Sequence, residues 1–130
     1  MFQRRYAYIC VIVALALALH GYENLTEWRR SASPGAAYWA LGVFLWAMTP
    51  YALCAIVARL SVYAVPANVG ISVAFLFDLG MHHEIAASTS STRGLGYIFM
   101  PLWNLILLAP LSMLFIQWVL KKSRPNENAP

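Results

Sequence analysis

The sequence predicts an all-α integral membrane protein, a polytopic bundle of four transmembrane helices with both chain ends in the cytoplasm (N-in/C-in). Of its 130 residues, 61% are hydrophobic and 11% are charged, whereas soluble domains have about 45–50% and about 25%. Four stretches without Asp, Glu, Lys or Arg have 17 to 28 residues. A hydrocarbon core needs roughly 20, so each suffices if flanking Arg or Lys side chains snorkel to the interface; the stretches are residues 6–22, 31–58, 60–77 and 94–120. A spanning backbone must satisfy its own hydrogen bonds, and these stretches do not alternate as barrel strands do, so they are predicted to be helices.

The first predicted span covers residues 6–22. An alternative is that residues 1–20 form a cleaved signal peptide, because two arginines precede an apolar run that contains Ala16 and Ala18. Cleavage would leave three spans and an external N-terminus. Residues 23–35 are predicted to form an outer loop. Ser33 and Pro34 are expected to break any helical turn in this loop before the second span begins.

The second and third spans are predicted at residues 38–58 and 62–80. Only three residues separate them, so they must form a tight antiparallel hairpin. Pro50 lies midway along the second span and predicts a kink there, where Thr49 can hydrogen-bond the carbonyl that the proline leaves free. Pro66 falls in the first turn of the third span, where its missing N–H costs little.

The fourth span is predicted at residues 95–120, after a polar loop of serines and threonines. Pro101 and Pro110 predict kinks on either side of Asn104. The Asn104 amide is expected to hydrogen-bond to another helix, which would stabilise the bundle by about 1 kcal/mol. Alternatively, the bent helices open a cavity between the second and fourth spans for a lipid or a small hydrophobic ligand. Residues 1–122 thus form the transmembrane domain, and residues 123–130 are predicted to be a disordered cytoplasmic tail.

The positions of the charged residues predict the orientation. Six of the nine Lys and Arg residues lie on the side of the two chain ends, which the positive-inside rule places in the cytoplasm. A bacterial cytoplasmic (inner) membrane is the expected location. No helix carries a basic stripe with interleaved aromatic residues, so no nucleic-acid partner is predicted.

One group of residues could carry chemistry at the outer face: Asp78, His82, His83 and Glu84, joined by His20 at the end of the first span. Histidine and carboxylate are common ligands of transition metals, so this group predicts either a metal site or a proton relay. Adjacent histidines on a helix point about 100° apart, which counts against both binding one ion. The alternative is that Asp78 pairs with His82 while His83 and Glu84 face water. No other cofactor is predicted.

Three functions fit these features. The leading one is a non-enzymatic accessory or interaction protein, including an immunity-type protector, which docks on a membrane-protein partner. It follows from the lack of catalytic motifs and from the short loops. The second is a self-associating small transporter or channel component, against which count the absence of an internal repeat and of an acidic residue deep within any span. The third is a membrane enzyme with a metal or proton-relay site at the outer face.

Overall fold

A computed structural model describes residues 2–31, 33–60, 64–90 and 93–123. These residues form helices joined by short links, and no strand occurs among them. Four helical segments are long and apolar enough to cross a membrane: Ala7–Arg30, Pro34–Arg59, Ala64–Ala87 and Gly94–Lys122. The prediction of an all-α protein with four transmembrane helices is therefore confirmed.

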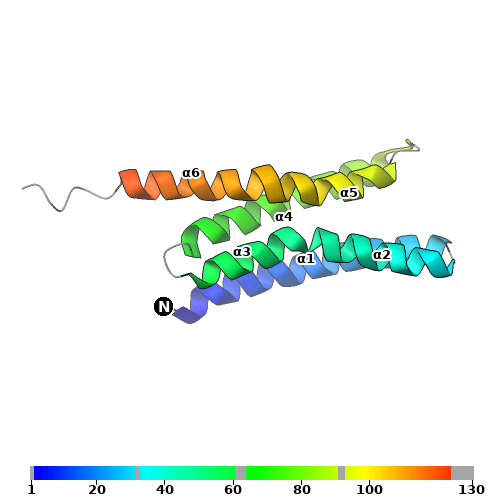
Figure 1. Ribbon diagram of the computed structural model, residues 1–130, viewed down its shortest axis with the longest axis horizontal. Helices are drawn as coiled ribbons and strands as arrows, with labels where there is room; N and C mark the ends of the chain where they lie inside the picture. Colours follow the sequence, from blue (N-terminus) through cyan, green and yellow to red (C-terminus); the bar gives the residue numbers. More distant parts are fainter. Residues whose placement is uncertain (1, 32, 61–63, 91–92, 124–130) are drawn as a thin grey trace, which may run out of the picture.

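The four segments lie lengthwise against one another, and successive segments run in opposite directions (Figure 1). The elements are, in order, α1 (Phe2–Ser31), α2 (Pro34–Ala47), α3 (Thr49–Arg59), α4 (Ala64–Ala87), α5 (Arg93–Trp103), the π-helix η2 (Asn104–Leu108) and α6 (Ala109–Lys122). The start of α1, the end of α3, the start of α4 and the end of α6 share one end of the bundle. The end of α1, the start of α2, the end of α4 and the start of α5 share the opposite end.

Two of the predicted outer loops are largely helical. The first helix continues to Ser31, through most of the predicted loop 23–35, and the third continues beyond residue 80 to Ala87. Charged residues such as Glu23 and Glu84 are good helix formers, so they mark where hydrocarbon ends and not where a helix ends. Asp78, predicted close to the end of the third span at residue 80, therefore lies nine residues before the end of α4, and it is 1% exposed.

Pro50 divides the second span as predicted. Helix α2 ends at Ala47 and α3 begins at Thr49. The Thr49 hydroxyl donates a 2.5 Å hydrogen bond to the Trp46 carbonyl, which is the group that loses its partner because Pro50 has no N–H. The side chain thereby satisfies the backbone at the break.

The irregularity expected around Pro110 takes the form of a π-helix. Directly before this proline, the chain widens into η2, and the Ala109 N–H bonds to the Asn104 carbonyl five residues earlier. Pro110 cannot donate to the carbonyl one α-helical turn before it, and a wider turn accommodates that lost bond. Pro101, in contrast, lies inside α5 without ending it.

Helix α4 is the centre of the bundle and contacts the other three spans. Its buried face is rich in small residues, which allow close approach: a Cβ atom on Gly70 would lie 2.8 Å from Met113 Cγ and 3.3 Å from the Ala109 carbonyl oxygen of α6. Helix α1 contributes Ile9 and Ala16 to the core, so the segment that a signal peptide would occupy packs within the bundle. Residues 124–130 of the predicted tail lie outside the described residues.

Candidate functional site

Five polar side chains meet inside the bundle, and every span supplies at least one. We call them the buried cluster: His20 from α1, Tyr51 from α3, Asp78 and His82 from α4, and Asn104 from η2. Tyr51 and Asn104 are 0% exposed, His20 and Asp78 are 1% exposed, and His82 is 5% exposed. Ionisable groups within a membrane span are costly and usually functional, so this cluster is the first candidate for a site.

Asp78 is the hub of the buried cluster. Its Oδ2 atom accepts a 2.5 Å hydrogen bond from the Tyr51 hydroxyl and lies 3.0 Å from His20 Nε2. Its Oδ1 atom accepts a 2.5 Å hydrogen bond from Asn104 Nδ2. Asn104 thus makes the interhelical bond expected of it, and it also donates to the Ala74 carbonyl at 3.3 Å. Protein donors replace water on both carboxylate oxygens.

The two histidines extend the cluster away from Asp78. His82 Nε2 lies 3.2 Å from His20 Nδ1, and the two ring centroids are 5.0 Å apart. The other ring nitrogen of His82, Nδ1, is buried and has no hydrogen-bond partner among the described residues. Asp78, His20 and His82 therefore form a continuous hydrogen-bonded chain that ends at an open ring nitrogen.

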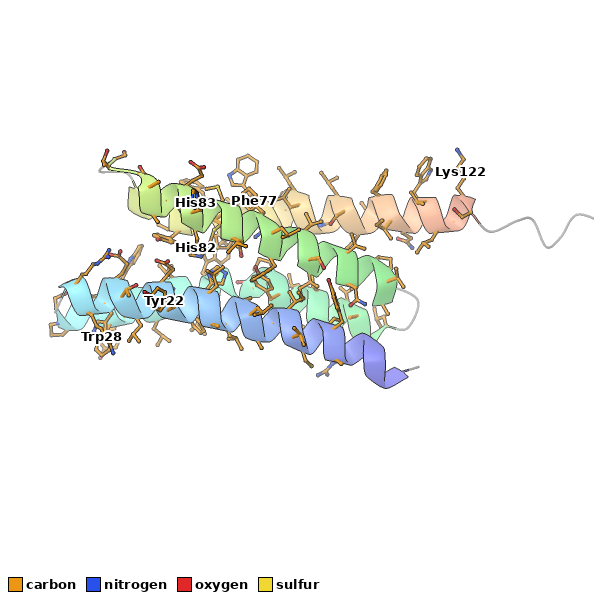
Figure 2. The ribbon with its side chains drawn as sticks, turned by 180° about the vertical axis from the view of Figure 1, so that it is seen from behind. Tyr22, Trp28, Phe77, His82, His83 and Lys122 are labelled. Carbon is orange, nitrogen blue, oxygen red and sulfur yellow. The ribbon has the colours of Figure 1, made fainter. Side chains whose placement is uncertain are left out.

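Helical geometry explains which of the predicted site residues meet. Asp78 and His82 are four residues apart and share the inner face of α4. His83 and Glu84 are exposed, and Figure 2 shows His82 between α4 and α1, with His83 on the outer side of α4. The expected direct pairing of Asp78 with His82 is replaced by a relay, because His20 lies between them.

The arrangement suits a proton better than a metal ion. Within the described ranges, no three His, Cys, Asp or Glu side chains are grouped as a metal site. In the buried cluster, His20 uses both ring nitrogens on its neighbours, so the donor atoms face one another and not a shared point. Metal ligation by His20, Asp78, His82, His83 and Glu84 remains a prediction.

Tyr51 is the member of the buried cluster that sequence reasoning missed. It lies far from both ends of the second span, next to Pro50, where tyrosine is out of place unless its hydroxyl has a partner. A tyrosine at that position in the sequence could therefore have indicated a buried polar contact. The inner face of α3 is otherwise apolar, with Cys54 and Ala58 buried one and two turns further on.

A cavity of about 260 Å³ lies beside the buried cluster, at the end of the bundle that holds the α1–α2 link. We call it the aromatic cavity. It is lined by parts of α1, α2 and α5, with the rings of Trp28, Trp39 and Tyr97 and the carboxylates of Glu23 and Glu27. The Tyr97 ring centroid lies 5.4 Å from that of His82, so Tyr97 adjoins both the cavity and the buried cluster. Helices α1 and α2 supply most of the cavity lining, and none of Pro50, Pro101 and Pro110 is part of it, so the cavity expected at the bends between the second and fourth spans remains a prediction.

No known protein family, no curated protein sequence and no solved structure matches the chain.

Proposed function

We propose that the protein is a small transporter or channel component that carries protons, with Asp78 as the intramembrane proton-binding group. The observation that supports this proposal is the hydrogen-bonded chain of an aspartate and two histidines inside an apolar four-helix bundle. Chains of Asp, Glu and His are the usual proton relays of membrane pumps and transporters. An accessory subunit that only docks on a partner needs no buried carboxylate.

The buried cluster can pass one proton inward with every atom accounted for. At the start, Asp78 is a carboxylate, His20 donates to it through Nε2–H, and His82 donates through Nε2–H to His20 Nδ1; these tautomers are assigned from the hydrogen-bond geometry. A proton arrives at His82 Nδ1. The Nε2 proton of His82 then moves to His20 Nδ1, and the Nε2 proton of His20 moves to Asp78 Oδ2. Asp78 ends protonated, and both histidines end neutral with their tautomers exchanged.

The depth of Asp78 supports transport across the membrane. It precedes Glu84, the charged residue that marks the end of the hydrocarbon on α4, by six positions, which at about 1.5 Å per residue places it roughly 9 Å inside that boundary. This is about a third of a 30 Å hydrocarbon core. Ionisable residues inside the hydrocarbon region commonly mark ion and proton pathways.

The partners of Asp78 lie on the irregular spans. Tyr51 follows Pro50 at the break between α2 and α3, and Asn104 is the first residue of η2. Discontinuous helices and π-helical turns are common at transport and functional sites, because irregular backbone can rearrange at modest cost. A proton that reaches Asp78 from one side could leave by a shift of these two spans.

The orientation belongs to the same proposal. The start of α1 and the end of α6 lie at one end of the bundle, and the excess of Lys and Arg in the adjoining parts of the sequence supports a cytoplasmic location of that end in a bacterial inner membrane. The aromatic cavity then lies at the outer end of the bundle, and His82 is the α4 member of the relay nearer to that end.

Proton flux in proteoliposomes tests the proposal. The purified chain is reconstituted with a pH-sensitive dye in the lumen, and a potassium gradient with valinomycin sets the membrane potential. We expect flux above that of empty vesicles, and at least a tenfold loss in Asp78→Asn, since the amide cannot take up the proton. Glu84→Gln is the matched control, because it removes an exposed carboxylate from the same helix and should leave the flux unchanged.

A second variant separates a relay from a purely structural cluster. His82→Gln keeps an amide that can hydrogen-bond, but it cannot receive and release a proton. A relay predicts lost flux with little change in thermal unfolding. Retained flux in a folded Asp78→Asn or His82→Gln protein would overturn the roles given to these residues, and wild-type vesicles without flux would overturn the proposal in favour of an accessory role.

A further inference from the structure

The aromatic cavity contains two carboxylates, Glu23 and Glu27, and they differ in the partners that the structure describes for them. Glu27 forms an ion pair with Arg30 at 2.9 Å. Glu23 accepts a 3.4 Å hydrogen bond from the Tyr97 hydroxyl, and no ion pair to Glu23 is present among the described residues. Glu23 therefore presents a negative charge to a partly enclosed space, where a cation would stabilise it.

The walls of the cavity indicate the kind of cation. Trp28, Trp39 and Tyr97 come from three different helices and line one space. Faces of aromatic rings attract diffuse positive charge, and cages of aromatic rings are a recurring way in which proteins recognise quaternary ammonium groups. A bare metal ion would need several converging oxygen, nitrogen or sulfur ligands, and the walls are mostly aromatic and aliphatic instead.

The size of the cavity limits the ligand. Its volume of about 260 Å³ lies just below the roughly 300–1,000 Å³ that drug-sized ligands occupy. We propose that the aromatic cavity binds a small organic ammonium ion, with Glu23 opposite its charge and Trp28, Trp39 and Tyr97 around its alkyl groups. The site itself does not depend on the proposed proton transport; that its ligand influences the relay, through the contact of Tyr97 with His82, rests on that proposed function.

Equilibrium binding to the full chain in detergent micelles tests the site. Choline and tetramethylammonium are titrated by calorimetry, with 3,3-dimethylbutan-1-ol as the uncharged analogue of choline. We expect saturable binding of both cations and at least about tenfold weaker binding of the alcohol, since the analogue loses both the carboxylate and the ring attraction. Sodium ions at the same concentration should not displace choline.

Two variants and two matched controls test which residues bind choline. Glu23→Gln and Trp39→Leu should each weaken choline binding about tenfold or more. Trp39 is 62% exposed, so its replacement leaves the fold intact. Glu84→Gln removes a carboxylate and Trp118→Leu removes an exposed tryptophan, both away from the cavity, and neither should change the affinity.

Three results would contradict the proposed cation site. Absence of saturable choline binding by the folded wild-type chain, equal binding of the uncharged alcohol, or displacement by sodium would each overturn the proposed site. Proton flux measured on the same preparation separates the two proposals: flux without choline binding removes only the cation site, and choline binding without flux removes only the proton pathway.

Discussion

Replacing Tyr51 by phenylalanine isolates one hydrogen bond of the buried cluster. The ring is 0% exposed and stays packed in the Phe variant, so the loss is confined to the hydroxyl that donates to Asp78 at 2.5 Å. Hydrogen bonds to charged groups contribute about 1.5–3 kcal/mol, whereas interhelical hydrogen bonds in a membrane protein average about 0.6 kcal/mol. Asp78 keeps its contacts with His20 and Asn104, so its carboxylate stays partly satisfied. We therefore expect the free energy of unfolding to fall by an amount at the lower end of the range for charged groups, about 1.5–2 kcal/mol.

A double-mutant cycle with Tyr51→Phe and Asp78→Asn measures that bond. The free energy of unfolding is obtained by titrating the protein in mixed micelles with sodium dodecyl sulfate and following helicity by circular dichroism. The interaction free energy between the two positions should be about 1.5 kcal/mol or more. Tyr38→Phe is the matched control: Tyr38 is 80% exposed, and its change should stay within about 0.5 kcal/mol.

The size of the coupling decides whether Asp78 carries a negative charge in the folded protein. A value below about 0.5 kcal/mol would refute an ionised Asp78 held by the Tyr51 hydroxyl. The relay starts from that ionised state, so the first step of the proposed proton transfer would have to be abandoned with it.

The remaining predictions concern transport, binding, packing and orientation. Asp78→Asn should lose at least tenfold in proton flux while Glu84→Gln does not, and Glu23→Gln should weaken choline binding about tenfold or more, as set out above. Gly70→Val should lower the free energy of unfolding by about 1–3 kcal/mol more than Gly80→Val, because a Cβ at Gly70 meets Met113 and the Ala109 backbone whereas Gly80 faces open space; equal losses would refute close packing of α4 on α6. In a background without native cysteines, an impermeant maleimide added to intact cells should label Thr89→Cys and should reach Ser123→Cys only after permeabilisation; the reverse pattern would invert the proposed orientation.

The number and type of the elements follow from the sequence because lipid allows few solutions. A long stretch without charged residues must be a helix when no water can satisfy its backbone. The ends of the helices could not be obtained in this way. Glu23 and Asp78 end two of the apolar stretches, yet α1 and α4 continue through them to Ser31 and Ala87. Pro34 marks the start of α2, but α4 ends before Ser88 without a proline nearby.

The members of the buried cluster were easier to predict than their contacts. His20, Asp78, His82 and Asn104 stand out because polar groups are rare in apolar spans. Their pairing depends on how each helix is rotated about its axis, and in a membrane the lipid-facing and inner faces are both apolar, so hydrophobic periodicity carries little information on rotation. Tyr51 escaped notice because tyrosines are expected at the membrane interfaces.

The convergence of all four spans on one carboxylate has a consequence for assembly. Neighbouring residues on a helix point about 100° apart, so a helix that turned by a single residue would carry its polar group away from Asp78 and leave that group in hydrocarbon. The smooth apolar exteriors could otherwise dock at many angles. The polar contacts thus select one rotation of each helix about its axis. Only when all four helices have that rotation does every polar group of the buried cluster find its partner.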